Sequence, residues 1–130
     1  MRILLDTCAF LWITQGSDAL SPAAIEAFVN PENEVYLSVV SAWEINVKSQ
    51  LGKLPLPPER FIPKERKRHL IASLNLSEKD TLHLCKLPAL HKYPFDRMLI
   101  CQALEHSLTI LTPAPLIRQY PIRCLWQARG

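Results

Sequence analysis

Short apolar runs alternate with amphipathic segments along the chain, and this alternation predicts strands and helices in turn. Apolar runs rich in β-branched and aromatic residues predict five strands, over residues 2–5, 35–38, 70–74, 108–112 and 122–126. Helical periodicity and capping signals predict helices over residues 7–13, 22–29, 39–51, 59–68, 77–87, 94–106 and 116–120. This order is typical of a three-layer α/β/α domain with a mainly parallel central sheet of about five strands.

Prolines and one glycine mark the ends of several predicted elements. Gly52 follows the helix over residues 39–51 and is a common helix stop. Three prolines within residues 55–58 exclude a helix there, and Pro63 is expected to interrupt or kink the helix that follows. Ser77 has the spacing of a capping box with the acid three residues later and should begin the next helix.

Length and composition narrow the class of protein. A chain of 130 residues is the size of one domain, so we expect a single unit over residues 1–130. No apolar run approaches the roughly 20 residues that cross a bilayer, and the N-terminus lacks a secretory pattern. The four cysteines are widely spaced without a C-x-x-C pair, which disfavours zinc and fits reduced thiols. We therefore expect a cytoplasmic protein without a membrane span.

The net charge is only +3, but the basic residues are unevenly distributed. A dense run within residues 64–69 is usually a solvated helix face, and its alternative role is contact with phosphate groups. A second basic group flanks the acid at position 96. The candidate phosphate contacts in these two places are Lys64, Arg66, Lys67, Arg68, Lys92 and Arg97.

Three acids stand in places where a carboxylate is unusual. Asp6 ends the first apolar strand, and Glu44 lies on the apolar stripe of the helix over residues 39–51, directly after Trp43. Asp96 begins a helix that is apolar nearly all round. Each has an ordinary explanation, since a buried Glu often pairs with an Arg and an Asp in a first helical turn caps amides.

Taken together, the three acids predict a metal site. In a parallel sheet, strand ends and the following helix starts lie at one edge, so Asp6 and Asp96 should converge there, with Glu44 reaching in from its helix. Three oxygen donors without His or Cys suit Mg²⁺ or Mn²⁺ better than Zn²⁺.

The sequence resembles the PIN-domain ribonucleases and, within them, the VapC-like toxins of bacterial toxin–antitoxin pairs. The resemblance covers essentially the whole chain. It is strongest at residues 4–8 (LLDTC), 41–45 (SAWEI), 94–103 (PFDRMLICQA) and 111–113 (LTP). It implies a PIN-like fold and a metal-dependent endoribonuclease with Asp6, Glu44 and Asp96 as ligands of Mg²⁺ or Mn²⁺. The resemblance also implies a catalytic role for Thr112, an RNA substrate, a cognate antitoxin and a homodimer.

Two positions depart from the family pattern, and both remove negative charge from the expected site. Ala114 stands where a fourth acid is usual, and Tyr93 stands where an Asp is frequent. Loss of a ligand weakens metal binding, so we expect weakened activity. The alternative is a catalytically impaired binding module that keeps its antitoxin and subunit interactions without turnover.

Other roles and classes are less well supported by the residues. Trp12 and Trp43 are expected to pack in the core rather than stack on bases. A phosphatase with an aspartyl nucleophile needs a second Asp at position 8, where this chain has Cys8. A dinucleotide-binding domain needs a glycine-rich loop, and none is present.

Overall fold

A computed structural model describes residues 1–126 of the chain. Within that range one sheet is formed by five strands, and all neighbouring pairs are parallel. The strands are β1 (Arg2–Leu5), β2 (Glu34–Ser38), β3 (Ala72–Leu74), β4 (Thr109–Leu111) and β5 (Cys124–Leu125). Their order across the sheet is β3-β2-β1-β4-β5, which puts β1 at the centre.

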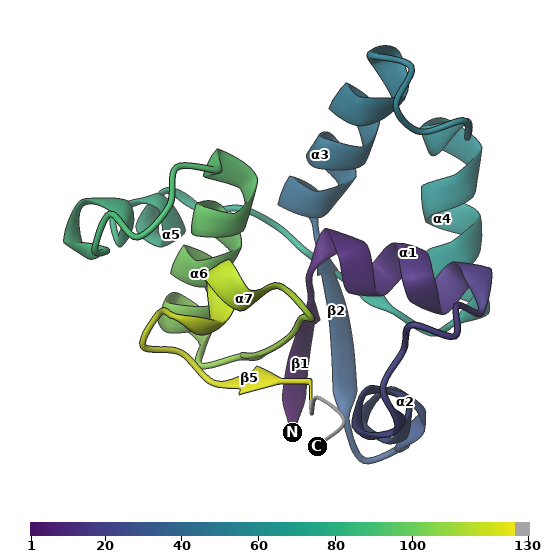
Figure 1. The fold of residues 1–130 in the computed structure, drawn as a ribbon, viewed down its shortest axis with the longest axis horizontal. Coiled ribbons are helices and arrows are strands. Elements are labelled where there is room, and N and C mark those ends of the chain that lie inside the picture. Colours follow the sequence, from purple (N-terminus) through teal and green to yellow (C-terminus); the bar gives the residue numbers. More distant parts are fainter. Residues whose placement is uncertain (127–130) are drawn as a thin grey trace.

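Helices connect the strands and cover both faces of the sheet (Figure 1). They are α1 (Thr7–Gln15), α2 (Pro22–Val29), α3 (Val39–Gln50), α4 (Pro58–Arg68), α5 (Glu78–Thr81), the 3₁₀ turn η1 (Leu84–Lys86), α6 (Pro94–His106) and α7 (Pro115–Arg118). The side chains of Asp6, Ser21 and Ser38 cap α1, α2 and α3 by accepting from backbone amides in the first turn. No helix within residues 1–126 combines the length and the apolar character needed to span a membrane.

The alternation of side chains along β1 builds two cores. Ile3 and Leu5 pack on one side with buried residues of α1, α2 and α4, whereas Leu4 packs on the other with α6 and α7. All three side chains are fully buried, and each such burial contributes roughly 1.5–3 kcal/mol. The expected three-layer α/β/α architecture is confirmed, and the sheet is parallel throughout.

The strand order creates a switch point beside the central strand. From β1 the chain continues to β2 and β3 on one side, and it later returns to place β4 and β5 on the other. The carboxyl ends of β1 and β4 are therefore neighbours, joined by the bond from the Asp6 amide to the Leu111 carbonyl at 3.2 Å. In open parallel sheets this crevice is where ligands bind.

Several elements differ in extent from the sequence prediction. The helix expected over residues 77–87 is reduced to α5 and η1; Leu82 is exposed, so its apolar positions gain little packing to stabilise a longer helix. The strands at the two edges of the sheet are short: β3 has three residues and β5 has two. The start expected at residue 70 is wrong because Leu70 has a positive φ of 56°.

Helix α4 covers the predicted residues 59–68 and is not interrupted at Pro63. Pro63 is exposed near the middle of the helix, so the one backbone bond that it removes lies at the surface, where water is available.

The predicted apolar stripe of α3 is only partly correct. Val40 is buried, but Trp43 is 59% exposed and Leu51 is 64% exposed. The buried face of the helix is formed by Val40, Ser41, Glu44 and Ile45. Glu44 therefore faces inward as expected, although Trp43 does not.

Candidate active site

Asp6 lies at the carboxyl end of β1 and is only 3% exposed. Its Oδ1 accepts from the Ala9 amide at 2.7 Å, and its Oδ2 accepts from the hydroxyl of Thr112. Burial raises the pKa of Asp6 to about 6, against the lowering effect of these two hydrogen bonds, and the charges of Asp96 and Glu44 add to the rise. Asp6 is therefore held firmly while its charged form remains unfavourable.

Thr112 lies directly after β4 and is fully buried. Its hydroxyl donates to Asp6 and accepts from the Ala114 amide at 2.9 Å. Ala114, where the resemblance predicts a fourth acid, lines the same cleft as Asp6.

Glu44, on α3, is 3% exposed and has three side-chain partners. The hydroxyl of Thr7 donates to Oε1 at 2.6 Å. The hydroxyl of Tyr93 donates to Oε2 at 2.6 Å, and Nζ of Lys48 lies 2.8 Å from the same oxygen. The hydroxyl of Ser41 lies 2.9 Å from that of Thr7 and extends the network. The carboxylate is buried and almost completely satisfied by protein donors.

Asp96 lies in the first turn of α6 and is partly buried. Its Oδ2 lies 3.3 Å from Nε2 of His91, whose Nδ1 lies 2.9 Å from the hydroxyl of Tyr120. Burial raises the pKa of Asp96, and the charge of Glu44 also raises it, whereas the contact with His91 lowers it. The charged form of Asp96, like that of Asp6, is therefore disfavoured by its surroundings.

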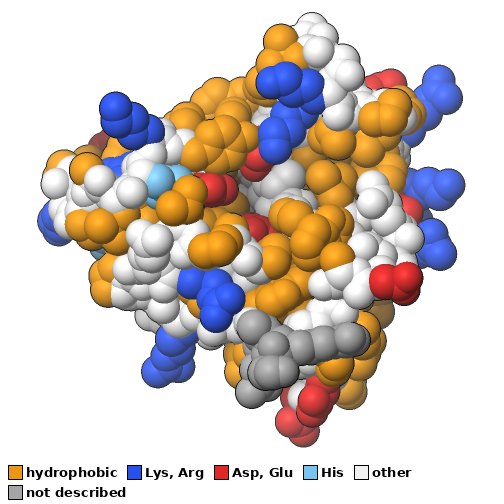
Figure 2. Space-filling model, viewed as in Figure 1, with side chains coloured by type: hydrophobic (Ala, Val, Ile, Leu, Met, Phe, Trp, Pro, Cys, Tyr) orange, Lys and Arg blue, Asp and Glu red, His pale blue; other side chains and the backbone are white. Residues whose placement is uncertain are grey.

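The three acids open on one cleft of about 300 Å³. Figure 2 shows acidic side chains in the hollow at the centre of this face, bordered by hydrophobic ones. The residues that line the cleft come from the end of β1, from α1, α3 and α6, and from the loop after β4: Asp6, Thr7, Cys8, Leu11, Trp12, Glu44, Lys48, Tyr93, Asp96 and Ala114.

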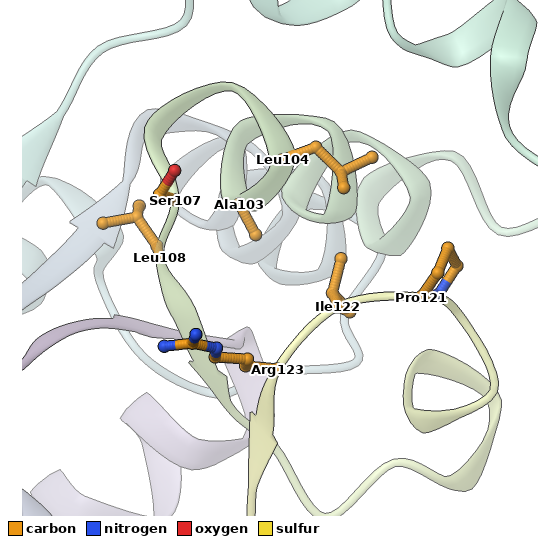
Figure 3. A pocket seen from close by; sticks show the side chains of 7 residues that line it. All are labelled: Ala103, Leu104, Ser107, Leu108, Pro121, Ile122 and Arg123. Atoms are coloured by element: carbon orange, nitrogen blue, oxygen red, sulfur yellow. The ribbon is translucent and has the colours of Figure 1, made fainter.

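A second pocket, of about 280 Å³, lies between the end of α6 and the segment before β5 (Figure 3). Its lining is mostly apolar, and Arg123 is its one charged residue. Ser107 is the other polar residue of its lining, and no carboxylate, histidine or cysteine stands among the described residues that line this pocket, so it lacks the gathered acids of the acidic cleft.

The donors of the acidic cleft fit a hard divalent cation in part. Asp6 and Asp96 present carboxylate oxygens to the same cleft, and such oxygens are the ligands that Mg²⁺ and Mn²⁺ prefer. Glu44 is already engaged by Lys48 and Tyr93. Within residues 1–126, no three His, Cys, Asp or Glu side chains are arranged to hold one ion. The cleft fits an ion held by two carboxylates that keeps several of its waters.

The basic residues singled out in the sequence lie outside the cleft. Arg97 donates to the carbonyl of Pro88 at 3.0 Å and to the hydroxyl of Tyr120 at 2.9 Å, so it holds the loop before α6. Lys92 is exposed on that loop. The run Lys64, Arg66, Lys67 and Arg68 belongs to α4, and Figure 2 shows the Lys and Arg side chains on that side at the outline of the molecule. Contact of these residues with RNA stays a prediction.

Sequence reasoning missed the partners of Glu44. Lys48 follows Glu44 by four residues on one helix, the spacing of a common ion pair, so it could have been found. Tyr93 was identified only as a departure from the family pattern. Its bond to Glu44 spans 49 residues of chain, and no local signal reports such a contact.

The expectation that Trp12 and Trp43 pack in the core is wrong. Trp43 is exposed and contacts Phe95 edge-on, with ring centroids 4.8 Å apart. Trp12 is half-buried and lines the cleft, 5.6 Å from the ring of Trp126. Trp12 therefore borders the cleft, whereas Trp43 packs against Phe95 at the surface.

The fold and the cleft define a class: a parallel α/β domain that gathers acidic residues at the carboxyl edge of its central strands. The family model of the PIN domain matches residues 3–113, and the chain belongs to this family. PIN domains are generally nucleases. No curated protein sequence matches the chain.

Solved structures share this fold at low sequence identity. VapBC2 from Rickettsia felis, bound to a DNA fragment from its promoter, is similar with a TM-score of 0.74 and 15% identity, covering 98% of this chain and 100% of that chain. VapBC-1 from nontypeable Haemophilus influenzae has a TM-score of 0.64 and 17% identity, over 96% and 97% of the two chains. FitAcB from Neisseria gonorrhoeae has a TM-score of 0.52 and 16% identity, over 94% and 95%.

Proposed function

We propose that this chain is a divalent-metal-dependent endoribonuclease of the VapC-like toxin type, which hydrolyses RNA phosphodiester bonds in the acidic cleft. The observation that carries the proposal is the convergence of three carboxylates from β1, α3 and α6 on that cleft. Like charges gathered at a buried site are unfavourable unless a cation joins them. Membership of a family whose members are generally nucleases supports this reaction class.

Asp6 and Asp96 are the residues that would hold Mg²⁺ or Mn²⁺. Such an ion, when bound, polarises a phosphate oxygen and lowers the pKa of a coordinated water. The chain's own residues position these ligands: Thr112 donates to Asp6, and His91 contacts Asp96. These contacts fix the directions of the carboxylates, as outer-shell partners of metal ligands do. Attack of water on phosphorus opposite the departing 3′ oxygen leaves a 5′-phosphate and a 3′-hydroxyl.

RNA would approach over the rim of the cleft. Lys48 lines the cleft, with Nζ 2.8 Å from Oε2 of Glu44, and can contact a phosphate there. Lys92 and Arg97 on and beside the loop before α6, and the basic run of α4, are the more distant candidates for phosphate contacts.

We expect the activity to be weak. Ala114 adds no carboxylate at the cleft, and Tyr93 donates a hydrogen bond to Glu44 where an Asp would add negative charge. The same features favour a second candidate function, a PIN-fold binding module that keeps its protein interactions without turnover. The engaged state of Glu44 is the specific observation behind this alternative.

Either function is compatible with a protein partner. The solved relatives VapBC2 and VapBC-1 are toxin–antitoxin complexes, which supports a cognate antitoxin as the partner of this chain. The family resemblance further suggests a homodimer. Size measurement of the protein alone and with a co-expressed antitoxin tests both expectations.

Cleavage of end-labelled single-stranded RNA with Mn²⁺ distinguishes the two functions. The nuclease proposal predicts slow cleavage that EDTA and Asp6→Asn abolish, and about tenfold faster cleavage after Ala114→Asp, because affinity follows ligand charge and number. A silent parent beside an active Ala114→Asp variant supports the binding module. Silence of both proteins in saturating Mn²⁺ contradicts the nuclease proposal.

A further inference from the structure

The acidic cleft already contains a cation of the chain's own. Nζ of Lys48 lies 2.8 Å from Oε2 of Glu44, four residues earlier on α3, and 38% of the lysine side chain is exposed. The same ammonium group lies 5.7 Å from the centre of the Tyr93 ring. Burial opposes the charge of Lys48, but the hydrogen bond and charge of Glu44 outweigh it and raise the pKa of the lysine.

Tyr93 completes the hold on Glu44. Its hydroxyl donates to Oε2 at 2.6 Å, and burial together with the bond to Glu44 raises the pKa of Tyr93 to about 12. Tyr93 therefore stays protonated and remains a donor at neutral pH. With Thr7 on Oε1, three of the roughly four acceptor positions of this carboxylate are used.

We propose that Lys48 and Tyr93 set the metal affinity of the cleft by holding Glu44 away from the ion. The proposal rests on the metal dependence in the proposed function. A divalent ion bound by Asp6 and Asp96 would share the cleft with the ammonium group of Lys48. The two positive charges would repel each other, which lowers the affinity for the ion. Glu44 can become a third ligand only when it exchanges these donors for the ion.

This arrangement gives Glu44 two alternative partners. Without metal, Lys48 neutralises a buried carboxylate that would otherwise be strongly unfavourable. With metal, the ion neutralises it and Lys48 is released toward the mouth of the cleft, where its side chain is already partly exposed. An ion pair with a purely structural role would instead leave metal affinity unchanged when it is removed.

Mn²⁺ titration of the full chain, followed by electron paramagnetic resonance of the free ion, tests the proposal. Lys48→Met should bind Mn²⁺ about tenfold more tightly than the parent, since a competing positive charge is lost. Tyr93→Phe should give a smaller gain in affinity and the double variant the largest. Lys48→Arg retains the charge, and Lys53→Met removes the same charge from an exposed position outside the cleft lining. The Mn²⁺ affinity of both variants should stay within about twofold of that of the parent.

Thermal denaturation provides a second measurement on the same proteins. Lys48→Met should be less stable than the parent in EDTA and should recover more stability on addition of Mn²⁺, because the ion then takes the place of the lysine. If Lys48→Met does not fold, the affinity of Tyr93→Phe alone decides the outcome. Equal or weaker Mn²⁺ binding by the variants, including no binding by any protein, overturns the proposal.

The outcomes separate this inference from the nuclease proposal. Tighter Mn²⁺ binding by Lys48→Met, with no RNA cleavage by any variant, leaves the inference standing and contradicts the nuclease. RNA cleavage by the parent, with unchanged Mn²⁺ affinity of Lys48→Met, supports the nuclease proposal and contradicts the inference about Lys48.

Discussion

At the scale of single residues, Asp6 is anchored by hydrogen bonds at a place where burial destabilises its negative charge. It caps α1 through the Ala9 amide and accepts from Thr112, which anchors its carboxylate at the switch point of the sheet. It is also buried beside two other acids, so its charged form is destabilised. A change of a carboxyl pKa from its ordinary 3.8 to about 6 corresponds to about 3 kcal/mol.

Asp6→Asn should therefore stabilise the metal-free protein at neutral pH. The folded state binds a proton at Asp6 more readily than the unfolded state. Asp6 therefore does not lower the free energy of unfolding below pH 3.8, lowers it increasingly as the pH rises, and lowers it by the full amount above about pH 6. We expect the variant to gain about 1–2 kcal/mol in free energy of unfolding at pH 7.5, less than the full effect because the amide replaces one acceptor.

Urea denaturation in EDTA at pH 7.5 and at pH 4.5 measures this difference. The gain should shrink markedly at the lower pH. A variant that is less stable than the parent at pH 7.5, or a gain that grows on acidification, would show that Asp6 is not destabilised by its surroundings.

The acids of the site were predicted from the sequence, but the residues that contact them were missed. Asp6, Glu44 and Asp96 stood out because each carboxylate interrupts an apolar pattern or begins an apolar helix. The donor that completes Glu44 from a distant loop, Tyr93, leaves no trace in local periodicity. The sequence pattern therefore gave no sign that Tyr93 binds Glu44, whereas the spacing of Glu44 and Lys48 did allow their ion pair.

At the scale of elements, the position of α6 is decisive because it carries Asp96. A buried glutamine ties this helix to the strands: Oε1 of Gln102 accepts from the hydroxyl of Ser38 at 2.6 Å, and Nε2 donates to the carbonyl of Asn75 at 3.2 Å. Gln102 thus joins α6 to the end of β2 and to the segment after β3. Both bonds lie at the carboxyl edge of the sheet.

Gln102→Leu should lower the free energy of unfolding by about 2 kcal/mol, since it leaves the buried Ser38 hydroxyl without its acceptor and the Asn75 carbonyl without its donor. Gln50→Leu, an exposed change of the same kind at the end of α3, is the matched control and should be nearly neutral. Chemical denaturation of the three proteins measures both values. Equal stability of Gln102→Leu and the parent would mean that this crosslink does not hold α6.

Element types followed from the sequence more reliably than element lengths. The caps at Ser21 and Ser77 correctly mark the starts of α2 and α5. The stripe of α3 was partly misassigned because the helix stands at the edge of the sheet, where Trp43 covers Phe95 and not the core. Periodicity reports which residues share a face, but the tertiary neighbours decide which face is buried.

At the scale of the whole molecule, the alternation of elements predicted the three layers but not the order of the strands. Placing β1 between β2 and β4 is what brings Asp6 and Thr112 together, although 106 residues separate them in sequence. The two sides of the sheet then contribute Glu44 and Asp96 to the same edge. The acidic cleft thus results from the order of the strands, because each of these chain segments contributes one of these oxygen-bearing side chains to it.

The central proposal is that Asp6 and Asp96 would hold a divalent ion in this cleft. Anomalous diffraction from crystals of the full chain soaked in Mn²⁺ tests it most directly, with Asp96→Asn crystals as the control. The account predicts one Mn²⁺ peak bridging these two carboxylates, absent in the control. A cleft without a peak at saturating Mn²⁺, or a peak that persists unchanged in Asp96→Asn, would contradict it.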